Sequence, residues 1–380
     1  MQRKKIVTML VVATGLVILG AGVLGSLSNV WRPTDSSVVT SQQTAPQHQH
    51  DLASAGPMFM DFLNGGAQAA EAATKIGNML PDSSNKKALE PTRVFVRDGV
   101  TVREYTLEIV KKVIDYGNGA TWEAWTFNGQ VPGPTLRVKP GEILRVHVIN
   151  KLDRVHSFHA HLSHVPQEMD GSQANIITGK GTGAMIPPGK EYTYEYQTGE
   201  QEFTYYHCHA GDEDYPINQH MLQGLYGAIL VEDPQVRQEV LFMGESGPER
   251  KGDAPFFIMN GLGLPGGEQT LEKVFKAQGL QGVVGQLGKT VPFYKMKVGE
   301  RMKLHITNIG NVIHSLHIHE IPLISLDVLN HRPWPAQVAP LVPGTADTLL
   351  IEFKNPGIWL FHCHVVSHAD AGMIGAFIVE

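Results

Sequence analysis

The chain has 380 residues, of which 42% are hydrophobic, and a formal net charge of −6. This length can bury a sizeable core and predicts two domains preceded by a leader. The acidic balance and the scattered Lys and Arg exclude a basic area for phosphates, so we expect no nucleic acid as a partner. Forty Gly and 23 Pro among short Val-, Ile-, Thr- and Tyr-rich runs favour an all-β fold.

The N-terminal segment 1–30 carries three basic residues and then an uncharged run from Ile6 to about Val30. Such a run fits a signal peptide or a membrane anchor, and both interpretations stay open. In either case we expect export, to the periplasm, the extracellular space or the outer face of the cytoplasmic membrane. Residues 31–91 are predicted to be a tether, in which the spacing over 58–80 predicts a short amphipathic helix.

Two series of strand-like runs follow and predict two domains, 92–234 and 235–380. The segment "GEILRVHVINKLDRVHSFHAH" begins at Gly141, and "GERMKLHITNIGNVIHSLHIH" begins 158 residues later, at Gly299. This offset brings Asn150 onto Asn308 and the histidines of one segment onto those of the other without a gap. A register kept over about twenty positions predicts two tandem copies of one β-sandwich. Between the two series, "EQTLEKVFKAQG" predicts a short helix.

The chain's two cysteines stand in identical His-Cys-His settings. Alternate side chains of a strand face opposite sides, so each Cys points away from its flanking histidines and one strand can serve two metal sites. A thiolate, two imidazoles and a long thioether contact form the ligand set of a blue copper centre. The predicted ligands are His156, Cys208 and His220 in the first domain, and His314, Cys363, His368 and Met373 in the second. Leu225 stands where the first site would have its Met, which should raise the reduction potential of that copper.

The histidine sides of these strands contribute a second set of imidazoles. Each domain supplies two from an H-x-H segment and two from H-C-H. The eight residues are His159, His161, His207, His209, His317, His319, His362 and His364. Eight imidazoles suit a cluster of three copper ions and are too many for one. A structural role would be the better interpretation of any single histidine, but matching sets in both domains favour metal binding.

Residues 92–380 resemble multicopper oxidases of the two-domain, laccase-like type through "HSFHAH", "HCH…HMLQGL", "HSLHIH" and "HCHVVSHADAGM". The resemblance implies two tandem cupredoxin-like Greek-key domains with a blue type 1 copper in each. It implies that His159 and His317 bind a type 2 copper and that the other six imidazoles bind a binuclear type 3 pair. The implied reaction takes single electrons from a phenol-like or metal-ion reductant and reduces O2 to water. The resemblance also implies a head-to-tail homotrimer in which neighbouring chains share each cluster.

Reduction of O2 consumes protons, and two carboxylates are candidates for supplying them. Asp170 in "QEMDGSQ" resembles the family's Asp beside the type 2 copper, and Glu320 directly follows His319. An acid of matched pKa is useful in that position. An Asp before Gly is also typical of a turn, so both interpretations of Asp170 stay open.

Two other functions remain alternatives at this point. Copper-containing nitrite reductases also have two such domains, but by resemblance they carry Asp where His159 stands, a non-ligand where His209 stands, and no H-C-H in the second domain. A non-catalytic copper protein, either an electron carrier or a copper store, is the other class. A carrier would leave the eight histidines unexplained, and a store would favour Met-rich or Cys-rich tracts, whereas the 13 Met are dispersed.

Overall fold

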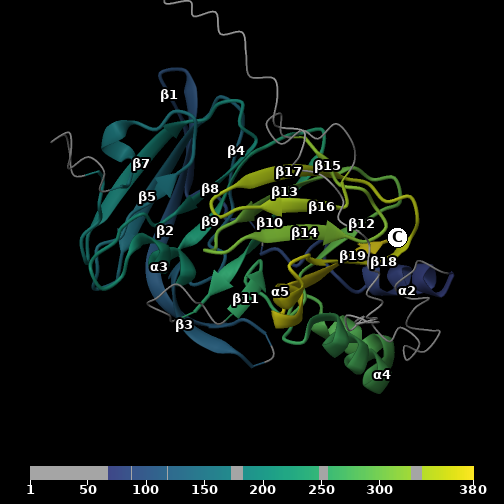
Figure 1. Ribbon diagram of the computed structural model, residues 1–380. Helices are drawn as coiled ribbons and strands as arrows, with labels where there is room; N and C mark the ends of the chain where they lie inside the picture. The colour runs from purple at the N-terminus through teal and green to yellow at the C-terminus, as the bar shows by residue number, and fades with distance from the viewer. Residues whose placement is uncertain (1–66, 87, 118, 173–182, 248–255, 327–335) are drawn as a thin grey trace, which may run out of the picture. The chain divides into compact units, whose positions relative to one another are not determined.

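The computed structural model describes residues 67–86, 88–117, 119–172, 183–247, 256–326 and 336–380. The predicted leader and most of the predicted tether lie outside these residues. Within the described ranges, no helix combines the length and the apolar character needed to cross a bilayer. The chain is mostly β, as predicted, and its strands form four sheets (Figure 1).

The first half of the described chain contains two of these sheets. One has the order β1-β2-β5-β7, with β3 paired to β2, and the other has the order β4-β9-β8-β6. The strands are β1 Arg93–Arg97, β2 Val100–Asp115, β3 Thr121–Phe127, β4 Leu136–Val138, β5 Ile143–Asn150, β6 His159–Ala160, β7 Glu191–Gln197, β8 Phe203–His207 and β9 Tyr226–Val231. Every second residue of β5 is buried, which agrees with the apolar alternation of "ILRVHVIN".

The second half contains the other two sheets. Their orders are β11-β10-β13-β17-β15 and β12-β19-β18-β14-β16. The strands are β10 Arg237–Ser246, β11 Phe256–Met259, β12 Phe293–Met296, β13 Met302–Asn308, β14 His314–Ile318, β15 Ile324–Ser325, β16 Val338–Leu341, β17 Ala346–Ile351, β18 Gly357–Cys363 and β19 Ile374–Val379. The domain boundaries 92–234 and 235–380 stay a prediction.

The two halves repeat one strand register. Strand β2 runs parallel to β5 with Ile109 opposite Asn150, and β10 runs parallel to β13 with Met243 opposite Asn308. Both asparagines are fully buried. Each Nδ2 donates to two backbone carbonyls, one four residues further along the chain and one from a distant segment. These carbonyls belong to Arg154 and Ile186 at 2.6 and 2.9 Å for Asn150, and to Val312 and Leu341 at 2.8 and 3.0 Å for Asn308. Each asparagine therefore fixes the turn that leads into the histidine-rich segment.

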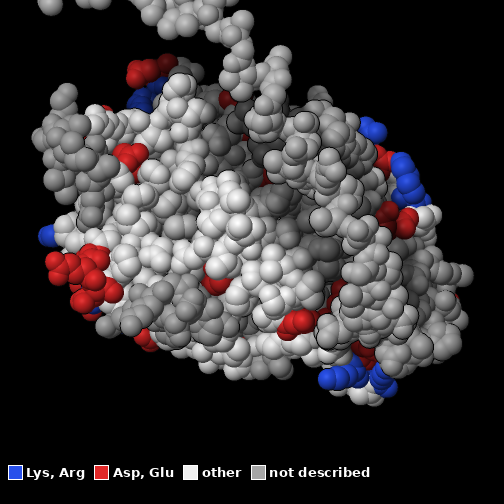
Figure 2. Space-filling view, viewed as in Figure 1, with Lys and Arg blue, Asp and Glu red and all other residues white. Residues whose placement is uncertain are grey.

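Four α-helices and one 3₁₀ turn accompany the sheets in the part of the chain that the structure describes. Their bounds are α2 Ala67–Gly77, η2 Gln167–Met169, α3 Ile217–Leu222, α4 Gly267–Gln286 and α5 Val366–Ala371. Helix α2 lies within the stretch 58–80 for which a helix is predicted, of which residues 58–66 lie outside the described residues. Its Ala73 and Ile76 share a buried cluster with Ile358 and Leu360. Helix α4 extends past the predicted stretch, and its helical conformation is interrupted at Gly279, where φ is 61°. On the face shown in Figure 2, the Lys and Arg side chains lie at separate places.

Candidate metal centres

The first cysteine site consists of His156, Cys208 and His220. Cys208 lies directly after β8 and His220 lies on α3, and all three side chains are buried. The Sγ of Cys208 is 3.5 Å from Nδ1 of His156 and 3.2 Å from Nδ1 of His220. The ring of Trp125 packs edge-on against both imidazoles, with centroids 5.3 and 5.1 Å away. The site is therefore compact and sealed from water.

The second cysteine site consists of His314, Cys363 and His368. Cys363 ends β18, His314 begins β14, and His368 lies on α5. Both Nδ1 atoms lie 3.8 Å from the Sγ and 3.2 Å from each other. His314 is fully buried, whereas His368 is half-buried and packs against Phe257 at 4.5 Å between ring centroids. This site therefore has one ligand within reach of the surface.

Leu225 and Met373 occupy equivalent positions in the two sites. The N–H of Leu225 donates to the carbonyl of His220, and its carbonyl accepts from Cys208. Met373 makes the same pair of bonds, with His368 and Cys363. Both side chains are fully buried. The backbone thus places a Leu in the first site where the second has a thioether.

The first quartet consists of His159, His161, His207 and His209. His159 on β6 lies opposite His207 on β8. The ring of His159 lies 4.9, 5.2 and 4.8 Å from those of His161, His207 and His209. The Nε2 atoms of His161 and His207 are 3.1 Å apart. His161 is exposed, so this quartet reaches the surface.

The second quartet consists of His317, His319, His362 and His364. His317 on β14 lies opposite His362 on β18. The ring of His317 lies 4.9, 5.3 and 5.3 Å from those of His319, His362 and His364. His364 is exposed. Across the residues that the structure describes, no ring contact or shared donor group joins the two quartets.

Backbone carbonyls orient four of these imidazoles. Nδ1 of His159 donates to the carbonyl of Asp170 at 2.6 Å, and Nδ1 of His317 donates to that of Gln337 at 2.7 Å. His207 and His362 each donate to the carbonyl of the following Cys, at 3.0 and 3.1 Å. A carbonyl only accepts, so Nδ1 carries the proton and the Nε2 of each neutral ring is free to bind a cation.

Three carboxylates lie near the quartets in sequence or in space, and two of them approach a quartet histidine. Oδ1 of Asp170 is 3.6 Å from Nδ1 of His159, so this predicted residue does lie beside the first quartet. Glu320 is exposed, and its Oε1 accepts from Asn355 at 2.6 Å instead of contacting a histidine. The sequence did not single out Glu268, yet its Oε1 lies 3.9 Å from Nε2 of His362. Glu268 comes from α4, and no spacing in the sequence relates that helix to β18.

Burial decides the protonation of these groups. It lowers the pKa of His156 and His207 to about 3, with repulsion from neighbouring imidazoles adding to the effect. It also lowers the pKa of His220 to about 4 and raises the pKa of the Cys208 thiol to about 11. Neutral imidazoles are the metal-binding form, and a thiol of raised pKa keeps its proton until a cation displaces it.

The donors fit copper. Bonds of about 2.0–2.3 Å to one ion place its ligands about 3–4 Å apart, as both cysteine sites have them. Several ring nitrogens are buried without a hydrogen-bond partner among the described residues, including Nδ1 of His209 and Nε2 of His319. Unpaired buried nitrogens are costly unless something binds them. A Cys and two His with an optional thioether suit copper better than Mg²⁺ or Ca²⁺.

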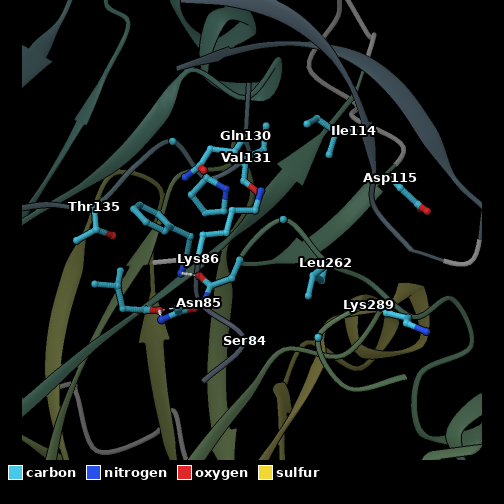
Figure 3. Close-up of a pocket in the computed structure, with 17 residues that line it drawn as sticks. Ser84, Asn85, Lys86, Ile114, Asp115, Gln130, Val131, Thr135, Leu262 and Lys289 are labelled. Atoms are coloured by element: carbon cyan, nitrogen blue, oxygen red, sulfur yellow. Dashed lines mark hydrogen bonds between the residues drawn. The ribbon is translucent and has the colours of Figure 1, made fainter. Parts of the chain in front are cut away.

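A separate cavity of about 320 Å³ lies away from these groups (Figure 3). Residues from both halves line it, among them Asn85, Lys86 and Asn260. Nδ2 of Asn260 donates to Oδ1 of Asn85 at 2.7 Å, and Nζ of Lys86 donates to the carbonyl of Val131 at 3.4 Å. No cysteine-site or quartet residue is among the described residues that line it.

Comparisons with known proteins relate the chain to copper proteins. Two family models, both described as multicopper oxidase, match residues 109–236 and 267–380. The chain is 26% identical to a copper-containing nitrite reductase of Neisseria meningitidis, over 79% of this chain and 75% of that protein. It is 20% identical to the multicopper oxidase mco of Staphylococcus aureus, over 76% of this chain and 90% of that protein.

Solved structures of copper proteins also match this chain. One described as a multicopper oxidase matches with a TM-score of 0.62 and 25% identity, covering 79% of this chain and 98% of its own. A copper nitrite reductase from Nitrosomonas europaea shares the fold with a TM-score of 0.57 and 23% identity, covering 73% of this chain and 94% of its own. Since family models match both halves and each half presents the donors that copper requires, the chain belongs to the multicopper oxidase family.

Proposed function

We propose that the protein takes single electrons from a reducing substrate at its two cysteine sites and reduces O2 to water at a cluster held by the two quartets. The observation that carries the proposal is the arrangement on β8 and β18. Each cysteine-site Cys is bonded through the backbone to two quartet histidines. Two kinds of site are thereby joined by a few covalent bonds, in both halves of the chain.

The residues have distinct roles in this proposal. Bound copper would supply one-electron and O2 chemistry, as type 1 ions in the cysteine sites and as a type 2 ion and a type 3 pair at the quartets. His159 and His317 would bind the type 2 ion, as the first His of each H-x-H does in the family that the chain resembles, and a backbone carbonyl at Nδ1 leaves the Nε2 of each ring free for it. The remaining quartet histidines would hold the pair. Trp125 keeps water from the first cysteine site.

Asp170 is proposed to hold and pass a proton needed for O2 reduction. Its carboxylate lies beside His159 and accepts a hydrogen bond from the hydroxyl of Ser172. The side chain is 31% exposed, so it can exchange protons with water while facing the quartet. Glu320 is the weaker candidate, because its carboxylate is engaged by Asn355.

The cluster is proposed to form between chains, in a head-to-tail homotrimer. A cluster of three ions needs both quartets, and each quartet has an exposed member, His161 or His364, at which a neighbouring chain could complete it. A ring of identical head-to-tail contacts closes with each first quartet against the second quartet of the next chain. The electron donor is proposed to approach the half-buried His368, since His220 is only 1% exposed.

Nitrite reduction is the second candidate, because curated relatives of this chain are copper-containing nitrite reductases. The presence of His159, His209 and the second H-C-H favours the oxidase, because a single-ion nitrite site would not use them all. Oxygen uptake by the copper-loaded protein, measured with phenolic, Fe(II) and dye donors and with nitrite as a competing acceptor, separates the two. We expect O2 uptake and no nitrite consumption.

A pair of variants makes this test specific to the quartets. His209→Ala should abolish O2 uptake while the blue absorption of the cysteine sites remains. His147→Ala is the matched control, because His147 contacts Thr193 at 3.0 Å and belongs to neither quartet. Nitrite consumption by the wild type, or unchanged O2 uptake by His209→Ala, would reject the proposal.

A further inference from the structure

The two cysteine sites differ in the group that faces the outer nitrogen, Nε2, of their first histidine, His156 or His314. In the second site, Nδ1 of His314 faces the Sγ of Cys363, and Nε2 lies 2.8 Å from Oε1 of Glu245. Both atoms are buried and form no hydrogen bond of regular geometry among the described residues, so the 2.8 Å contact is an ion-pair distance. With Nδ1 committed to a metal ion, Nε2 carries the proton and can only donate. The carboxylate of Glu245 is therefore the charged group that faces the outer nitrogen of this ligand.

Glu245 is held firmly in this position. It lies near the end of β10 and is only 3% exposed. Its other oxygen, Oε2, accepts from the backbone N–H of Asn311 at 2.8 Å. The backbone at Gly310 passes so close that a Cβ there would overlap Oε2. The contact with His314 is thus built into the packing of the strand and its neighbouring turn.

The first site has no such partner. Glu245 pairs with Phe257 across β10 and β11, and the equivalent pair across β2 and β3 is Lys111 with Trp125. The Lys111 side chain is 47% exposed, and its Nζ lies 3.6 Å from Oε1 of Glu123. Nε2 of His156 is buried, and the described residues offer it no hydrogen-bond partner. One strand position thus supplies a buried carboxylate in one half and a solvated lysine in the other.

We propose that Glu245 is a positioning residue that lowers the reduction potential of the second copper relative to the first. This inference rests on the proposed function, since it requires copper in both cysteine sites. A carboxylate 2.8 Å from the protonated outer nitrogen of an imidazole makes that ring a stronger donor to the metal. A buried negative charge also favours the more highly charged Cu(II) over Cu(I). Both effects stabilise the oxidised ion of the second site.

Met373 should also lower the reduction potential of the second copper. A thioether near the second copper lowers its potential compared with the first, where Leu225 stands. The first copper is therefore reduced before the second during stepwise reduction. The second copper is the stronger reductant of the two and passes its electron to the cluster with the larger driving force.

The test is a spectroelectrochemical titration of the blue absorption of copper-loaded protein. Cys208→Ser leaves only the second blue site and Cys363→Ser leaves only the first, so each midpoint is measured separately. In the Cys208→Ser background, Glu245→Gln should raise the Cu(I)-to-Cu(II) ratio at fixed potential by about tenfold, equal to about 59 mV. Glu239→Gln is the matched control on the same strand, since Glu239 contacts Asn85 and Arg237 and neither cysteine site. We expect it to change the ratio less than twofold.

Two results would overturn the inference. One is an unchanged midpoint in Glu245→Gln protein that still shows its blue absorption. The other needs no change at Glu245: if the second site has a midpoint equal to or above that of the first, the proposed order is wrong. Absence of blue absorption from the wild type would instead count against the proposed function, so the two failures are distinguishable.

Discussion

Cys208 and Cys363 are alike in sequence and in burial but not in their surroundings. Each is fully buried and lies within 3.8 Å of two Nδ1 atoms. Around Cys208 these ligands are covered by Trp125, whereas around Cys363 one imidazole is half-buried. The same donor set thus sits in one closed and one more open pocket, and each should bind its own ion.

Removing either thiol should remove one of two independent blue centres. We expect Cys208→Ser and Cys363→Ser each to keep about half of the thiolate-to-copper absorption and the double variant to keep none. Absorption spectra of the copper-loaded proteins, normalised to protein concentration, provide the measurement. A single variant that loses the whole band would show that only one site binds blue copper.

The grouping of the donors was predictable at this scale, and their outer partners were not. H-x-H and H-C-H place two imidazoles on one face of their own strand, but that His159 lies opposite His207 follows only from the folded sheet. Glu245 and Glu268 reach the sites from β10 and α4, and sequence spacing carries no information on such long-range packing. Their contacts require the folded arrangement of the sheets.

The turns that carry the histidines depend on buried asparagines at the ends of β5 and β13. The predicted repeat already paired Asn150 with Asn308, and the structure gives the pairing its reason. Helix α4 was harder to predict, because its continuation beyond Gly279 lacks a strong apolar period. Periodicity predicts elements well where one face is buried and poorly where packing is partial.

Asn150→Ala and Asn308→Ala should each lower the free energy of unfolding by about 1–3 kcal/mol, because one buried and one part-buried carbonyl each lose a donor. Chemical denaturation of the apo-protein measures this change. Asn355→Ala is the control, since the side chain of this exposed residue donates to the exposed carboxylate of Glu320 and its loss should change stability by less than about 0.5 kcal/mol. Equal effects at all three positions would contradict the role of the buried pair.

At the scale of the whole molecule, acid should destabilise the apo-protein through its buried histidines. The folded-state pKa lies at about 3 for His156, His207 and His305, and at about 4 for His220 and His319. Their unfolded value is near 6.5, so between these limits the unfolded chain binds protons that the folded chain does not. Stability should therefore fall as the pH drops from about 6.5 towards 4.

Thermal melts of apo-protein across this pH range measure the effect. His305→Gln should weaken the dependence without altering a proposed ligand, because His305 is buried against Phe203 and Thr348. Carboxylates with lowered pKa, such as Glu142, lose their contribution to the free energy of unfolding only below about pH 4.5. Their effect therefore lies outside most of this pH range. A melting temperature that stays constant between pH 6.5 and 4.5 would contradict the predicted loss of stability through the buried histidines.

If neighbouring chains share each cluster, as proposed, two differently defective subunits should rescue each other. One variant lacks the first quartet through His207→Ala and His209→Ala, and the other lacks the second through His362→Ala and His364→Ala. Co-expressed in equal amounts, they should form rings in which about one quarter of the interfaces have two intact quartets. O2 uptake should then return in the mixture but in neither variant alone. No rescue in verified mixed trimers would contradict the shared cluster.

The central claim is that eight imidazoles hold three copper ions, two of them as a coupled pair. Total copper compared with copper detected by electron paramagnetic resonance, on one sample of active oxidised protein, tests it most directly. A bridged Cu(II) pair is silent in this experiment, so the account predicts about five copper ions per chain, of which about three are detected. About two ions per chain, all of them detected, would contradict it.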